Sequence, residues 1–152
     1  TGLFNAEREP DLRDLFARLP KFKLTEVAAA AAVVTVEFDP ARVWPGEKPE
    51  RYVELFGNEL RNVSRGSFGA KPPPELPAER LKRVEIPVEG LDCQGCCLAA
   101  YRLVYQLKGV ELATVSFKAG QVVAIVDPDK VDRAALEAAL KKGGVEVVAP
   151  KK

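Results

Sequence analysis

The three cysteines of this 152-residue chain all lie in the stretch GLDCQGCC, at positions 93, 96 and 97. Cys93 and Cys96 have the spacing C-x-x-C, which allows two thiolates to converge on one soft metal ion such as Cu(I), Hg(II), Zn(II) or Cd(II). Thioredoxin-like redox motifs use the same spacing. The stretch therefore predicts either a metal site or a redox site, and the elements around it must decide between the two.

The C-x-x-C is expected at a junction between a strand and a helix. Residues 83–90 alternate between polar and apolar types like a strand, and helical spacing then relates Cys97, Ala100, Leu103, Val104 and Leu107. At the start of a helix, unpaired backbone N–H groups and the positive helix end stabilise a thiolate. We therefore expect a cysteine at this junction to have a pKa below its usual value of about 8.5.

The rest of the second half continues this pattern. VELATVSF and QVVAIV predict two strands around a turn at Ala119-Gly120, Asp132 is expected to cap a second helix that ends at Gly143-Gly144, and VEVV predicts a last strand. The resulting order, β-α-β-β-α-β, is that of a ferredoxin-like α+β domain. Such a domain has a four-stranded antiparallel sheet with both helices on one face.

The sequence GLDCQGC, followed by a helix, LKGV, a strand, DP and ALKKGGVEV, resembles the heavy-metal-associated (HMA) domain over about residues 83–148. The resemblance implies that Cys93 and Cys96 hold a metal ion, as in metal chaperones, mercury-binding proteins and the N-terminal modules of metal-pumping ATPases. It also implies a metal-donor or metal-acceptor protein as partner, such as a metal-transporting ATPase. A thioredoxin would need a parallel βαβ core, which the predicted order lacks.

Two positions depart from the usual pattern of that family. Leu91 replaces a methionine, and Val145 stands where a tyrosine or lysine is usual, which leaves Lys141 and Lys142 as weaker substitutes for a cation near the thiolates. Asp92 matches the version of the motif associated with divalent Zn, Cd and Pb transport.

Asp92 and Cys97 are candidates for a further ligand beside Cys93 and Cys96. A carboxylate from Asp92 would be a third, harder ligand suited to Zn(II), whereas two thiolates suffice for Cu(I) or Hg(II). An aspartate before a helix start is, however, often only a cap. Cys97 diverges from Cys96 by about 100° around the helix, so we expect Cys97 to fill the core rather than to bind the ion.

The chain contains two units, and the first part of one, up to Val43, aligns with the first part of the other, up to Val131, without gaps at an offset of 88 positions. At this offset Leu19 to Asp39-Pro40 matches Leu107 to Asp127-Pro128, and Gly2-Leu3 matches Gly90-Leu91. We therefore predict a tandem repeat whose first copy begins part-way through its first strand. The offset places the alanine-rich residues 26–36 on a β-hairpin, although alanine favours helix.

The first copy has lost the metal chemistry, because Asn5 and Arg8 fall where Cys93 and Cys96 lie. A guanidinium at a cation site opposes metal binding. We predict a degenerate first domain at residues 1–70, a proline-rich linker at 71–82 and the HMA domain at 83–152. The first domain would serve as a packing partner or a docking surface, and its aromatic residues Phe38, Trp44, Tyr52 and Phe56 would fill its own core.

Composition excludes several classes of function. With 23 basic and 22 acidic residues, the net charge of +1 gives no footprint for nucleic acid or anionic membranes. The longest apolar run, residues 27–34, is far shorter than the roughly 20 residues that span a bilayer, so we expect a soluble chain without a transmembrane segment. The absence of histidine excludes imidazole ligands and Cys-His or Ser-His-Asp nucleophiles. The absence of methionine favours, slightly, an exported protein with its leader removed over a cytoplasmic one, and the compartment stays open.

The sequence therefore predicts a protein that binds one heavy-metal ion per chain, with Cu(I) and Zn(II) as the leading candidates, for metal transport, transfer or detoxification. We do not expect an enzyme. A thiol-redox module and a protein-interaction scaffold are the alternatives. A homodimer in which two chains share one ion through four thiolates is also open.

Overall fold

The computed structural model describes residues 1–72, 74 and 76–149. The chain divides into two compact units, Thr1–Pro73 and Pro74–Lys152, which are called the first and second unit below. Within the predicted linker, positions 73 and 75 lie outside the described residues, as do positions 150–152 at the end of the predicted second domain. No helix among the described residues has the length and apolar character needed to cross a membrane.

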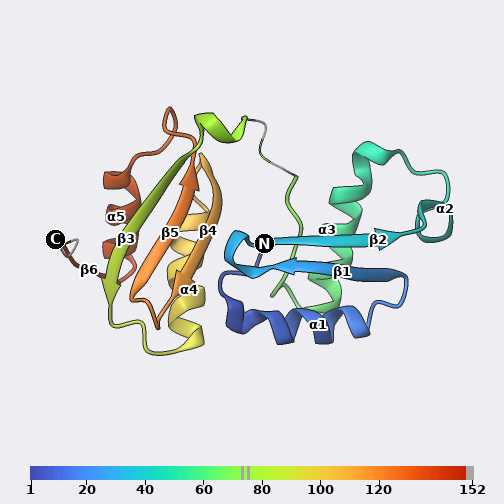
Figure 1. The fold of residues 1–152 in the computed structure, drawn as a ribbon, viewed down its shortest axis with the longest axis horizontal. Coiled ribbons are helices and arrows are strands. Elements are labelled where there is room, and N and C mark those ends of the chain that lie inside the picture. The colour runs from blue at the N-terminus through green and yellow to red at the C-terminus, as the bar shows by residue number, and fades with distance from the viewer. Residues whose placement is uncertain (73, 75, 150–152) are drawn as a thin grey trace. The chain divides into compact units, whose positions relative to one another are not determined.

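The second unit has the predicted β-α-β-β-α-β order. After a short 3-10 turn at Ala78–Arg80, its elements are β3 (Lys82–Glu89), α4 (Gln94–Tyr105), β4 (Val110–Ser116), β5 (Gln121–Val126), α5 (Arg133–Lys142) and β6 (Glu146–Val147). The four strands form one antiparallel sheet in the order β4-β5-β3-β6. Figure 1 shows α4 and α5 on the same side of this sheet. The ferredoxin-like prediction is confirmed for this unit.

Three connections of the second unit meet at one edge of its sheet. Because β3 and β4 both run antiparallel to β5, they end at the same edge. The Val88 N–H donates to the Gly120 carbonyl at 2.9 Å, which places the β4–β5 turn beside the end of β3. β6 starts at this edge as well, where Glu146 pairs with Glu89. The cysteine-containing connection from β3 to α4 therefore lies at the edge that also holds the α5–β6 connection.

The first unit is built on a β-hairpin. Its elements are η1 (Ala6–Arg8), α1 (Glu9–Ala17), β1 (Phe22–Ala28), η2 (Ala29–Ala31), β2 (Val33–Phe38), α2 (Pro40–Val43), η3 (Pro49–Arg51) and α3 (Tyr52–Val63). β1 and β2 pair antiparallel, so the alanine-rich segment is a hairpin and not a helix, as the offset predicted. The turn closes without glycine, because Ala32 itself adopts a left-handed conformation with φ of 52°.

The prediction of a second complete ferredoxin-like domain is not confirmed. Among the described residues, the first unit has a two-stranded sheet. The described residues pair β1 with β2 alone, and α1 and α3 pack on this hairpin. The two ends of the unit are joined, because the Thr1 nitrogen donates to the Gly69 carbonyl at 2.7 Å and the Gly69 N–H donates to the Thr1 carbonyl at 3.2 Å.

The hairpin packs on α1 and α3 around a core of its own. The buried cluster consists of Leu3, Leu12, Leu15, Phe16, Leu19, Phe22, Leu60 and Phe68. The aromatic residues singled out from the sequence, Phe38, Trp44, Tyr52 and Phe56, border this cluster through ring contacts such as Phe38 to Trp44 at 5.2 Å. They are half-buried, so they extend the core of the first unit at its edge rather than fill its centre.

Candidate metal centre

A glycine and a thiol shape the loop between β3 and α4. Gly90 follows β3 with φ of 75°, a left-handed conformation that favours glycine. Cys93 is extended, with φ of −147° and ψ of 160°, and its Sγ accepts a hydrogen bond from the Cys96 N–H at 3.1 Å. A thiol therefore caps α4, in the role that serine, threonine, asparagine or aspartate usually fills. This hydrogen bond fixes the Cys93 sulfur at the helix start.

Asp92 does not cap the helix. Its carboxylate Oδ1 instead accepts a hydrogen bond from the Cys96 thiol at 3.3 Å. One ligand atom from each of Asp92, Cys93 and Cys96 lies within 4.8 Å of the others. Asp92 precedes the cap Cys93 and lies outside α4, so helical spacing does not predict this contact from the sequence.

The three cysteines differ in exposure. Cys93 is exposed, Cys96 is half-buried and Cys97 is 0% exposed. Ala100 and Val104, one and two turns further along α4, are also 0% exposed. Cys97 thus lies in the apolar core, at the position predicted from the helical spacing, and its sulfur is not part of the group formed by the other two cysteines and Asp92.

The thiols of Cys93 and Cys96 differ in acidity, because Cys93 accepts hydrogen bonds whereas Cys96 donates them. A hydrogen bond from the Cys96 thiol, assisted by the Cys96 N–H, lowers the pKa of Cys93. Donation to the Cys93 sulfur, together with donation to Asp92, raises the pKa of Cys96 to about 11. The expected acidification at the helix start therefore holds for Cys93 and fails for Cys96, whose proton lies between two acceptors. Of the two thiols, Cys93 therefore loses its proton more readily and Cys96 keeps its proton at neutral pH.

This difference predicts selective alkylation. During a short pulse of iodoacetamide at neutral pH, Cys93 should react at least about tenfold faster than Cys96. The reason is that the thiolate is the nucleophile and Cys96 retains its proton. Cys97 should react only after unfolding, since it is buried. Peptide mass spectrometry after quenching measures all three rates in one sample. Equal rates at Cys93 and Cys96, or a faster rate at Cys96, would contradict the assignment of the proton.

The connection from α5 to β6 faces the same edge of the sheet. Lys141 and Lys142 are exposed at the end of α5, and the Val145 N–H donates to the Leu140 carbonyl at 3.0 Å. Any side chain at Gly143 would collide with Leu103 of α4, so glycine permits α5 to end close against α4. Cationic side chains are thus available near this edge.

The second unit matches a known family. Residues 85–146 match the family model described as "Heavy-metal-associated domain". No curated protein matches the chain. Among solved structures, the chain is similar to a CopZ metallochaperone, with 30% identity over 44% of this chain and 100% of that chain and a TM-score of 0.43.

Two further solved structures have comparable scores. Oxidized MerP from Ralstonia metallidurans CH34 is 22% identical over 47% of this chain and 99% of its own, with a TM-score of 0.44. The water-soluble region of the P-type ATPase CopA from Bacillus subtilis is 28% identical over 45% of this chain and 45% of its own, with a TM-score of 0.43.

Proposed function

Residues 85–146 belong to the heavy-metal-associated domain family, and on that premise we propose that Cys93 and Cys96 together bind one soft or borderline heavy-metal ion for transport, transfer or detoxification. The observation that carries the proposal is the group formed by Asp92, Cys93 and Cys96, whose ligand atoms lie within 4.8 Å of one another. Sulfur ligands in this number suit Cu(I), Zn(II), Cd(II) and Hg(II).

Binding requires the removal of a proton. A coordinating cysteine must be a thiolate, so the ion displaces the proton that Cys96 shares with Cys93 and Asp92. Asp92, which accepts from the Cys96 thiol, is placed to receive that proton first. Uptake of the ion therefore releases a proton at Cys96, while Cys93, whose pKa is lowered, gives up its proton more readily.

Release follows from the exposure of the site. Cys93 is exposed and Cys96 half-buried, so an incoming thiolate from a partner can approach an ion bound between them. Two protein sulfurs leave coordination positions open, and the ion can pass on by exchange of one sulfur at a time. A metal-donor or metal-acceptor protein such as a metal-transporting ATPase is the partner that this chemistry suits.

Asp92 distinguishes the candidate metals. We propose it as a third ligand for Zn(II) or Cd(II), which accept carboxylate oxygen and higher coordination numbers, and as dispensable for Cu(I), which two thiolates satisfy. Its Oδ1 is already 3.3 Å from the Cys96 sulfur.

Replacement of Asp92 tests this role. In Asp92→Asn, the affinity for Zn(II) should fall about tenfold or more and the affinity for Cu(I) should change little, as measured by competition with chromophoric chelators under reducing conditions. Asp129→Asn is the matched control, since Asp129 is an exposed carboxylate between β5 and α5, at the opposite edge of the same unit. An unchanged Zn(II) affinity in Asp92→Asn would exclude Asp92 as a ligand.

A thiol-redox function is the second candidate. It is favoured by the acidity difference, because an exposed cysteine with a lowered pKa beside a protonated one is the arrangement that thiol exchange requires. The two functions need different states of Cys93 and Cys96. Metal binding needs both thiols reduced, whereas a redox function cycles them between thiols and a disulfide.

A further inference from the structure

The first unit contains a loop with the same backbone course as the cysteine-containing loop. Gly2 has φ of 88° where Gly90 has 75°, and both are left-handed. Asn5 has φ of −159° and ψ of 169°, close to the −147° and 160° of Cys93, and a helical segment follows at once in both units. The positions compared are 88 residues apart in each case. The first unit therefore keeps the loop conformation but carries other side chains on it.

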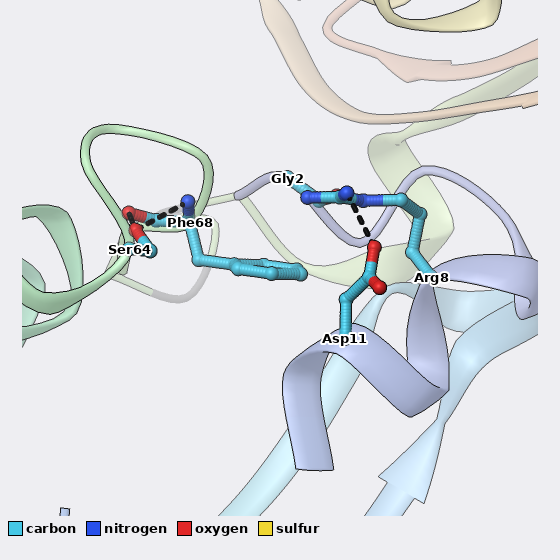
Figure 2. A network of polar contacts seen from close by, with 5 residues as sticks. All are labelled: Gly2, Arg8, Asp11, Ser64 and Phe68. Carbon is cyan, nitrogen blue, oxygen red and sulfur yellow. Dashed lines mark hydrogen bonds and ion pairs between the residues drawn. The ribbon is translucent and has the colours of Figure 1, made fainter. Parts of the chain in front are cut away.

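Arg8 is the residue at the position of Cys96, and its guanidinium lies among electron-rich groups (Figure 2). Its Cζ atom is 4.4 Å from the centroid of the Phe68 ring and 5.5 Å from that of Phe4. Its Nη1 donates to the Asp11 carboxylate at 2.6 Å, and its Nε donates to the Gly2 carbonyl at 3.4 Å. The side chain is only 18% exposed. Two ring faces, a carboxylate and a carbonyl thus surround a single positive charge.

We propose that the Arg8 guanidinium holds the loop of the first unit in place, as a bound metal ion would hold the corresponding loop of the second unit. The first unit then stays folded without metal and binds none, while the second unit alone exchanges an ion. The assignment rests on the proposed metal-binding role of Cys93 and Cys96.

The ring contacts carry most of the interaction. Asp11 is 56% exposed, so water weakens its ion pair with Arg8. Phe68 and Phe4 are 4% and 1% exposed, and a cation held against desolvated rings is attracted more strongly than one at an exposed ring. Arginine suits this role better than lysine, because its planar group stacks on rings and donates several hydrogen bonds at once.

Arg8 also connects the two ends of the first unit. Phe68 follows α3, and its N–H donates to the Ser64 Oγ at 2.9 Å, which fixes the turn that carries the ring (Figure 2). The loop at the start of the unit is thereby held to the segment at its end.

Substitution of Arg8 tests the stabilising role. In the full chain, Arg8→Met should lower the folded-to-unfolded ratio of the first unit about tenfold, Arg8→Lys should lower it less, and Arg13→Met should leave it nearly unchanged. Arg13 is the matched control, since it is 57% exposed and pairs with Glu9 on the same helix. Fluorescence of Trp44, the single tryptophan of the chain, reports the first unit. The denaturant must be urea, because guanidinium ions could replace the lost side chain.

Restoring thiols tests the equivalence of the two loops. In a Cys93→Ser/Cys96→Ser background, the added substitutions Asn5→Cys and Arg8→Cys should confer binding of one Cd(II) per chain, seen as thiolate-to-cadmium charge-transfer absorbance. If the variant is unfolded without metal, Cd(II) should restore the Trp44 signal.

Two results would overturn the inference. The first is an Arg8→Met variant as stable as Arg13→Met. The second is an Asn5→Cys/Arg8→Cys variant that gains neither Cd(II) absorbance nor the Trp44 signal while the natural chain binds Cd(II). A natural chain that binds no soft metal would instead defeat the proposed function of Cys93 and Cys96, and the Arg8→Met comparison would still decide the role of Arg8.

Discussion

Cys93→Ser and Cys96→Ser should each lower the affinity of the chain for Cu(I) by more than about a hundredfold. Loss of a group that merely orients a ligand costs about 10–100-fold in metal affinity, so loss of one of two sulfur ligands must cost more. Serine cannot replace the sulfur, because its hydroxyl is a hard donor that keeps its proton at neutral pH. Competition with a Cu(I)-specific chelator under reducing conditions measures the change.

Cys97→Ala is the matched control for both substitutions. Cys97 is 0% exposed in the core of α4, so alanine there should leave Cu(I) affinity within about threefold and should cost only modest stability. Circular dichroism before titration establishes that each variant is folded. A Cys97→Ala variant that loses the ion, or a Cys93→Ser variant that retains it, would contradict the assignment of the ligand pair.

Leu136→Ala should destabilise the second unit by about 2–5 kcal/mol. Leu136 is 0% exposed on α5, and its truncation removes buried apolar contacts and leaves a cavity in a well-packed core. Because α5 borders both α4 and β6, this loss weakens the scaffold that holds the cysteine-containing loop. Urea unfolding followed by far-ultraviolet circular dichroism measures the change.

The control for Leu136→Ala is Val33→Ala, a truncation of an apolar side chain that is 50% exposed. It should change stability by about 0.5 kcal/mol or less. A Leu136→Ala variant as stable as Val33→Ala would mean that α5 contributes little to the core of the second unit.

Periodicity predicts the second unit almost completely. The strand expected at 83–90 is β3, Lys82–Glu89, and the expected cap Asp132 accepts a hydrogen bond from the Ala135 N–H at 2.8 Å. In the first unit, propensity alone would have made a helix of the alanine-rich segment. Comparison with the second half corrected this, because cross-strand pairing and burial against α1 and α3 outweigh a local preference of less than about 1 kcal/mol per residue.

The sequence was sufficient to identify the residues of the candidate metal site, but not the hydrogen bonds that each of them makes. The spacing identified Cys93 and Cys96 and the side chains near them. It did not show that Cys93 rather than Asp92 caps α4, nor that the Cys96 proton lies between two acceptors, since both depend on side-chain rotamers. The contact of Arg8 with Phe68 was also missed, because it joins segments sixty residues apart and no local pattern connects them.

Titration of the reduced natural chain with Cu(I), with elemental analysis after removal of unbound metal, tests the central claim most directly. We expect one ion per chain, absent in Cys93→Ser/Cys96→Ser, and half an ion per chain if two chains share it through four thiolates. A chain that binds no ion with both thiols reduced, or a double variant that binds as much metal as the natural chain, would contradict the claim that these two sulfurs form a metal centre.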